Sequence, residues 1–270
     1  MTLDLDPATV CLSSVPRFQI LRRIAASPVG GYPTVLTGRK VGTVLAVLVA
    51  RRNTVVSVDQ LVDEVWGDRP PSRTVASLHV YVSQLRRLIG QSSGRTGPLI
   101  TRSPGYMMVI EPGELDLDIY RDLVELGRSQ FSAELLGQSS ITFERALSML
   151  GPGSTCEFGP GPALSGLSAW LEESRLECLD LKLQADLALG RHRQLISTLY
   201  SLVSEYPLHE SFYQYLMRAL NLCGRRAEAL SVYRSLRSRL ITELGIEPCD
   251  EVRLLHVAIL KAEKAGELVR

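Results

Sequence analysis

The most informative shortage in this 270-residue sequence is one of negative charge, because no Asp or Glu occurs between Arg69 and Ile110. The same 42 residues contain six arginines, at positions 69, 73, 86, 87, 95 and 102. The net charge of +1 conceals this bias, since residues 1–112 hold 13 Lys and Arg against 7 Asp and Glu, whereas residues 113–270 hold 17 against 22. The basic half is therefore expected to bind a polyanion, with nucleic acid the first candidate.

Long apolar runs and paired cysteines are lacking too. No segment approaches the roughly 18 consecutive apolar residues of a membrane span, and the N-terminus lacks the pattern of a secretion signal. The five cysteines, at 11, 156, 178, 223 and 249, are far apart and lie near no histidine cluster. We expect reduced thiols, no metal, no cofactor and no membrane partner, in a cytoplasmic protein associated with the nucleoid.

Enzyme signatures are also missing. The sequence has no GxxxxGK[ST], GxGxxG, HExxH or GxSxG motif, and its four histidines, at 79, 192, 209 and 256, are dispersed. Glu172, Glu173 and Glu177 flank Arg175 at helical spacing, which is more typical of an exposed charged face than of an acid/base pair. We expect no catalytic residues, and no enzyme activity.

The first part of the chain is expected to be a flexible arm (1–16) followed by an α+β winged helix-turn-helix domain (17–112). Apolar periodicity and turn residues predict strands at 18–24 and 34–36, a helix at 39–52, an extended segment at 55–56, a helix from Ser57 to Gly67, a helix at 73–89, and strands at 99–102 and 106–110. Ser57 and Ser72 are the expected helix caps, and Pro70-Pro71 the turn between the second and third helices.

The second part (113–270) is expected to be an all-α, tetratricopeptide-like domain, interrupted by a loop at 151–162. Leu189-Gly190-Arg191 recurs 34 residues later as Cys223-Gly224-Arg225. At the same offset, Leu195, Leu199 and Leu202 correspond to Ala229, Tyr233 and Leu236. That period is typical of stacked helix pairs joined by a glycine turn.

The third helix carries the candidate chemistry. Its predicted core stripe is Val75, Leu78, Val82, Leu85 and Ile89. The opposite face is polar or small and free of acids, and it consists of Arg73, Ala76, Ser77, Val80, Ser83, Gln84 and Arg87. A solvated helix face normally mixes Glu with Lys, so this composition favours close approach to DNA.

Each of these residue types has a possible contact on a duplex. Arg can pair with guanine, Gln with adenine, Ser with a base or phosphate, and exposed Val80 or Ala76 with a thymine methyl. Residues at the edges of the face, Thr74, His79, Tyr81 and Arg86, are expected on phosphates. Arg102 and Tyr106 of the hairpin are expected to reach a minor groove or phosphate.

A structural role remains open for several of these residues. Any single arginine can be merely solvated, and His79 can be an ordinary surface residue. Tyr81 can instead pack against the hairpin, and Val80 can touch protein. The acid-free run as a whole favours DNA more strongly than any one of its members.

The sequence resembles a known family in both halves. The run VYVSQLRRLI (80–89), with VDQLVDEVWGDRPP (58–71) before it and TRSPGY (101–106) after it, resembles an OmpR-type winged helix. Five further segments resemble the bacterial transcriptional activation domain: GPAL (161–164), LALGRHRQLI (187–196), YPLHESFYQYLMRAL (206–220), GRRAEALSVYRSLRSRL (224–240) and ELGIEP (243–248). In this order, over about residues 17–260, they resemble a small member of the Streptomyces antibiotic regulatory protein (SARP) family.

The resemblance implies a pathway-specific activator of antibiotic biosynthesis genes that binds promoter direct repeats and recruits RNA polymerase holoenzyme. It also implies a three-helix winged domain with a sheet on its N-terminal side. A homodimer or cooperative pair on DNA is expected, with the helical domain mediating protomer contacts. Residues 132–160 match the family's first helix pair only loosely. The ATPase module of larger relatives is not expected, so no ATP site is expected. A receiver domain is not expected either, so control by a phosphorelay is not expected.

Two other functions remain open. The helical repeats could form a scaffold that recognises proteins, with the basic half binding an acidic partner. A repressor could use the same DNA-binding half, because occupancy of a promoter does not by itself fix the transcriptional outcome.

Overall fold

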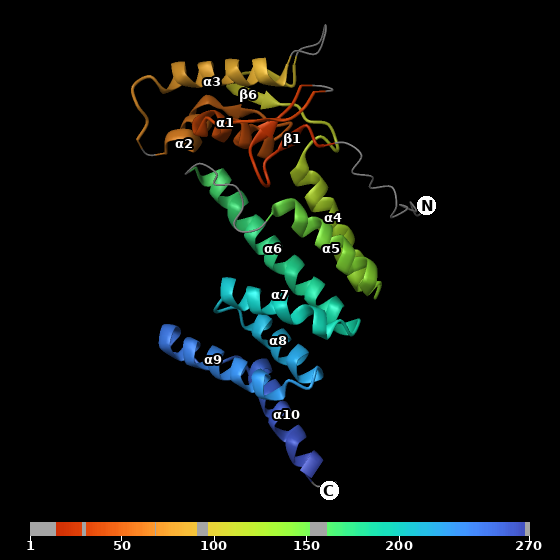
Figure 1. Ribbon diagram of the computed structural model, residues 1–270. Coiled ribbons are helices and arrows are strands. Elements are labelled where there is room, and N and C mark those ends of the chain that lie inside the picture. The colour runs from red at the N-terminus through yellow and green to blue at the C-terminus, as the bar shows by residue number, and fades with distance from the viewer. Residues whose placement is uncertain (1–14, 29–30, 68, 91–96, 152–160, 268–270) are drawn as a thin grey trace. The chain divides into compact units, whose positions relative to one another are not determined.

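The computed structural model describes residues 15–28, 31–67, 69–90, 97–151 and 161–267. The predicted arm at 1–16 therefore lies outside the described residues except for its last two. The chain divides into two compact units, one formed by residues up to Leu123 with Ala146–Arg175, the other by Val124–Arg145 with Leu176–Arg270. Helices α4 (Asp116–Ser132), α5 (Leu136–Leu150) and α6 (Pro162–Ala188) contribute residues to both units. Figure 1 shows the helices and strands along the chain.

The first unit begins with a small antiparallel sheet of order β1-β2-β3, formed by β1 (Phe18–Gln19), β2 (Ala25–Ala26) and β3 (Thr34–Val35). The predicted single strand at 18–24 is wrong, because the chain bends between β1 and β2. The backbone N–H groups of Ile20 and Leu21 donate to the carboxylate of Asp116 at 2.9–3.1 Å. A side chain about 95 positions away thus takes the place of a strand partner.

Three helices follow, at the positions the periodicity predicts: α1 (Arg39–Ala50), α2 (Val58–Trp66) and α3 (Thr74–Ile89). The Ser57 cap is confirmed, since its hydroxyl accepts from the N–H of Gln60 while the Gln60 side chain accepts from the N–H of Ser57. The Ser72 cap is wrong. Arg73 is the cap residue of α3, and it makes no side-chain capping bond.

Four members of the predicted α3 core stripe are buried, namely Leu78, Val82, Leu85 and Ile89. Val75 is not, because 47% of it is exposed. It lies at the margin of the stripe in the first turn of α3, so it falls outside the core that the later turns share with α1 and α2. Val75 therefore belongs to the outward surface of the helix.

A second sheet of order β4-β6-β5 carries the predicted hairpin, which we call the wing. It consists of β5 (Leu99–Arg102) and β6 (Gly105–Met108), and β6 also pairs with β4 (Val56–Ser57). A Cβ at Gly105 would lie 1.9 Å from the carbonyl oxygen of Val56, so only glycine permits this close approach of the strands. The strand ends two residues before the predicted Ile110.

The remaining helices are α4 (Asp116–Ser132), α5 (Leu136–Leu150), α6 (Pro162–Ala188), α7 (His192–Glu205), α8 (Glu210–Leu222), α9 (Arg226–Leu244) and α10 (Asp250–Glu267). The 34-residue repeat is confirmed. Gly190 and Gly224 both have φ +76°, and the N–H groups of Arg191 and Arg225 donate to the carbonyls of Asp186 and Leu220. All six apolar positions that correspond across the repeat are buried.

A third turn of this kind joins α4 to α5, and it uses Glu134 at φ +59° where the other two use glycine. The N–H of Leu135 donates to the carbonyl of Gln130, as the N–H of Arg191 does to that of Asp186. The loosely matching segment at 132–160 thus keeps the repeat's first turn without its glycine.

Candidate nucleic-acid interface

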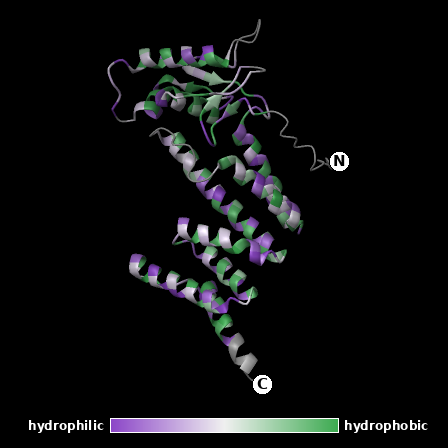
Figure 2. Ribbon diagram, viewed as in Figure 1, coloured by the Kyte–Doolittle hydropathy of each residue, from purple (hydrophilic) through white to green (hydrophobic). Residues whose placement is uncertain are grey.

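The outward face of α3 is well exposed and carries no acid. Its exposed residues are Arg73, Val75, Ala76, His79, Val80, Ser83, Gln84 and Arg87. Figure 2 shows hydrophobic and hydrophilic residues alternating along α3, as expected for a helix with one buried side. Val80 is 53% exposed, and the available surface also includes His79, predicted at the edge, and Val75, predicted in the core.

One edge of this face is occupied by aromatic packing. Tyr81 is half-buried and stacks on Trp66 of α2, with ring centroids 6.1 Å apart, while the ammonium of Lys40 lies 5.1 Å from the Trp66 ring centre. Thr74 on the same side is half-buried. Tyr81 therefore packs on α2 and not on the hairpin, while its expected phosphate contact stays a prediction.

Ser77 is half-buried as well, and its hydroxyl donates to the carbonyl of Arg73 at 3.1 Å. This bond is internal to the helix and satisfies the hydroxyl proton. Ser83 and Gln84, by contrast, lie on the exposed side. Within the predicted reading face, the polar groups most open to a ligand are therefore those of Arg73, Ser83, Gln84 and Arg87.

The other edge of α3 is bonded to the wing through Arg86. Its Nε donates to the carbonyl of Leu99 at 3.1 Å and its Nη2 to the hydroxyl of Thr101 at 2.7 Å, and its guanidinium lies 5.9 Å from the ring centre of Tyr106. Arg86 thus connects the helix to the hairpin, besides any contact it makes with a ligand. Tyr106 is only 7% exposed, so the predicted reach of its side chain into a groove is corrected to a packing role.

Arg102 is exposed at the end of β5, and Arg69 is exposed in the connection between α2 and α3. Arg73 and Arg87 are exposed on the outward face itself, which carries no carboxylate. Guanidinium groups suit both phosphates and guanine edges, because they present several donors in one plane.

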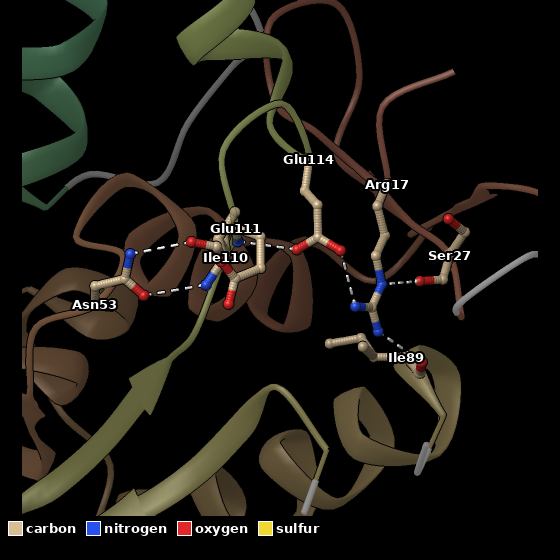
Figure 3. Close-up of polar contacts among 7 residues, drawn as sticks. All are labelled: Arg17, Ser27, Asn53, Ile89, Ile110, Glu111 and Glu114. Atoms are coloured by element: carbon tan, nitrogen blue, oxygen red, sulfur yellow. Dashed lines mark hydrogen bonds and ion pairs between the residues drawn. The ribbon is translucent and has the colours of Figure 1, made fainter. Parts of the chain in front are cut away.

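The C-terminal end of α3 is fixed by a residue that sequence reasoning missed. Arg17 donates to the carbonyl of Ile89 at 3.4 Å and to that of Ser27 at 2.9 Å, and it pairs with Glu114 at 3.3 Å (Figure 3). A cation at the last carbonyls of a helix is favourable. Arg17 therefore connects α3 to the first sheet and to the segment that leads into α4.

Asn53 holds the chain that leaves the wing, a second contact that the sequence did not signal. Its side-chain amide donates to the carbonyl of Ile110 at 3.0 Å and accepts from the N–H of the same residue at 3.1 Å (Figure 3). Asn53 adopts φ +60°, a left-handed conformation that asparagine tolerates better than most residues. The bonds of Arg17 and Asn53 thus connect the end of α3, the first sheet and the segment that follows the wing.

Asp116, which accepts from the N–H groups between β1 and β2, is a buried titratable residue of the first unit. It is 6% exposed, and burial raises the pKa of its carboxyl to about 6, although the N–H groups of Leu21 and Ile20 act in the opposite direction. The described residues contain no group of three or more side chains that could hold a metal ion. Over the same residues, no helix is long and apolar enough to cross a membrane.

A helix-turn-helix with a wing, joined to stacked helix pairs, defines a winged-helix transcriptional regulator with a helical-repeat domain. Comparison with known families agrees, because the family described as "Transcriptional regulatory protein, C terminal" matches residues 33–108 and "Bacterial transcriptional activator domain" matches residues 115–260. The regulatory protein DnrI of Streptomyces peucetius is 34% identical over 231 residues, which are 83% of this chain and 85% of DnrI. The chain therefore belongs to the SARP family of transcriptional regulators.

Two other relatives match this chain over only part of their own length. The regulatory protein AfsR of Streptomyces coelicolor is 34% identical over 96% of this chain, which spans only 26% of AfsR. The solved structure of Mycobacterium tuberculosis EmbR in complex with a low-affinity phosphopeptide superimposes with a TM-score of 0.77 and 30% identity, over 91% of this chain and 65% of that one.

Proposed function

We propose that the chain is a sequence-specific DNA-binding activator, pathway-specific for secondary-metabolite genes, that binds direct repeats in their promoters. The observation that carries this proposal is the outward face of α3, where Gln84, Arg87 and Arg73 are exposed with no acid among them, together with exposed Arg102 at the end of β5. Arg87 and Gln84 supply paired hydrogen bonds to guanine and adenine, each contributing about 1–3 kcal/mol of discrimination. Arg102 and Arg69 neutralise phosphates.

The rest of the proposal rests on membership of the family. Residues 17–112 form the DNA-binding domain and also contact RNA polymerase holoenzyme, while residues 113–270 mediate contacts between protomers as a homodimer or cooperative pair on DNA. The protein acts at the nucleoid in the cytoplasm. Deleting residues 176–270, which leaves the contacts of Glu114, Asp116 and Ala163 in the first unit in place, is expected to reduce activation of a reporter. Undiminished activation would contradict a role for the second domain.

A gel-shift and footprinting experiment with promoters of the neighbouring gene cluster tests the DNA-binding part. We expect a protected pair of direct repeats, and weaker protection with Arg87→Ala. Absence of any shift at low salt would favour the alternative of a helical-repeat scaffold with an acidic protein partner. A transcription assay on the same promoters separates the activator from a repressor that uses the same domain.

A further inference from the structure

Two hollows lie beside α7 in the second unit, one against the turn between α8 and α9 and the other between α7 and α9. One has a volume of about 660 Å³ and is lined by residues that include Arg193, Tyr200 and Cys223. The other has a volume of about 420 Å³ and is lined by residues that include Tyr200, Tyr213 and Arg239. Both are lined by Tyr200, so they meet at that side chain, and the two together are called the groove.

The groove is built by matching stripes on the two helices. α7 contributes residues 193, 196, 197, 200, 203 and 204, and α9 contributes residues 228, 231, 232, 235 and 239. Both sets follow the spacing of a single helical face. The span from Arg193 to Ser204 is about 16 Å at 1.5 Å per residue. An extended peptide of about five residues would fit that length.

Charge distinguishes this groove from the domain around it. Its charged lining consists of Arg193, Arg225, Arg239 and Glu228, whereas residues 113–270 as a whole carry 17 basic and 22 acidic side chains. Glu228 is engaged, because both its oxygens accept from Arg225 at 2.7 Å. Arg193 forms no ion pair within the described part of the chain, and Arg239 approaches Glu243 only at 3.9 Å. The groove thus offers two weakly neutralised cations.

Between the cations, the lining combines apolar side chains with small hydroxyls. Ile196 and Leu216 are buried beneath the surface, while Ser197 and Ser231 are exposed on opposite helices. Tyr200 is 40% exposed, with its hydroxyl 3.5 Å from Glu228. Such a lining suits the apolar side chains and main-chain groups of a peptide better than a sugar–phosphate backbone, which would need cations along its whole length.

We propose that this groove binds a short extended peptide of a partner protein, with an apolar or aromatic centre flanked by Asp or Glu. The carboxylates pair with Arg193 and Arg239, and the central side chain packs on Tyr200. The proposal concerns the helical domain only and does not depend on DNA recognition, so it can fail while the proposed function stands.

The test uses the full chain and a randomised seven-residue peptide library displayed on phage. We expect enrichment of peptides with acids on both sides of an apolar centre, and affinities for them that fall by roughly tenfold in the double variant Arg193→Glu/Arg239→Glu. The doubly substituted control Arg218→Glu/Arg234→Glu makes the same charge change at exposed positions outside the groove. The proposal is overturned if no peptide is enriched, if enriched peptides lack acids, or if the double variant binds as the control does.

The thiol of Cys223 gives a second readout, because it lines the groove whereas exposed Cys249 does not. A bound peptide should slow alkylation of Cys223 by N-ethylmaleimide, resolved by mass mapping, and leave Cys249 unchanged. Equal rates at Cys223 with and without peptide would place the peptide elsewhere. Displacement of the peptide by short single-stranded DNA would identify the groove as a nucleic-acid site and contradict the peptide assignment.

Discussion

The carboxylate of Glu64 in α2 accepts a hydrogen bond from the backbone N–H of Ala163, at the start of α6, over 2.8 Å. Glu64 is 3% exposed, and Gly161 packs so closely on it that a Cβ there would lie 2.4 Å from the Cα of Glu64. A carboxylate at a helix N-terminus satisfies an otherwise free N–H and interacts favourably with the helix dipole. Within the first unit, this contact secures the beginning of α6 to the helix-turn-helix.

Replacing Glu64 should therefore destabilise the first unit. We expect Glu64→Ala to lower the free energy of unfolding by about 1–2 kcal/mol, since it removes a helix cap and leaves the partly buried N–H of Ala163 without its acceptor. Gly161→Ala should have a similar or larger effect through its clash with Glu64. Asp63→Ala, at an exposed position of the same helix, is the control and should change stability by less than about 0.5 kcal/mol. Equal denaturation midpoints for Glu64→Ala and Asp63→Ala would contradict the capping role.

Arg86 and Arg87 are adjacent in sequence but should behave differently. Arg87→Ala should relax base preference at one position of the site, at a cost of about 1–3 kcal/mol, and leave the melting temperature unchanged. Arg86→Ala should weaken binding to all sequences alike and also lower the melting temperature, because the bonds to Leu99 and Thr101 are lost. Binding to a panel of single-base variants, together with calorimetry, separates the two. Identical profiles for both variants would refute the assignment.

Asp116 should make stability depend on pH. Its folded-state pKa of about 6 exceeds the ordinary value of 3.8, so the folded state holds a proton that the unfolded state releases between those values. The free energy of unfolding should fall as the pH rises from about 4 to 6, by up to about 3 kcal/mol from this group. The difference between wild type and Asp116→Asn, measured by urea denaturation across that range, isolates its contribution. A pH-independent difference would contradict the raised pKa.

At the turn positions with positive φ, introducing and removing glycine should have opposite effects on stability. Gly224→Ala should destabilise the second unit by about 1–2 kcal/mol, since φ +76° is unfavourable for a residue with a Cβ. Glu134→Gly should be neutral or stabilising by up to about 1 kcal/mol, because it relieves the same strain. Gly137→Ala, in α5 with open space around its Cβ, is the control and should not destabilise. Loss of stability in all three would argue against the turn conformations.

The helices and the Ser57 cap could be predicted from the sequence because their determinants are local, whereas the cap expected at Ser72 was wrong. The capping box of Ser57 and Gln60 lies within four residues, and the recurrence of Gly190 at Gly224 carries the repeat. Most of the exposed face of α3 could be predicted from its period, although Ser77 is half-buried and Val75 is exposed. Val75 was wrongly assigned to the core because periodicity does not show where along a helix the contacts with other helices end.

Features set by distant partners could not be predicted in this way. The bend between β1 and β2 depends on Asp116, and the end of α3 depends on Arg17, far away in the sequence. The position of Tyr106 in the wing suggested a side chain available to DNA, but the guanidinium of Arg86 lies over its ring. The turn at Glu134 has no glycine to mark it. In each case the deciding contact joins segments that no local pattern relates.

DNA binding by the outward face of α3 and the wing is tested most directly by the salt dependence of binding to the promoter repeats. If each protomer neutralises about four to six phosphates, log K should fall with log salt concentration with a slope of roughly −4 to −5. Removing a phosphate contact with Arg102→Ala should reduce that slope by about one. A slope near zero, with the same affinity for promoter and unrelated DNA, would contradict the claim that the acid-free face of α3 and its wing bind DNA.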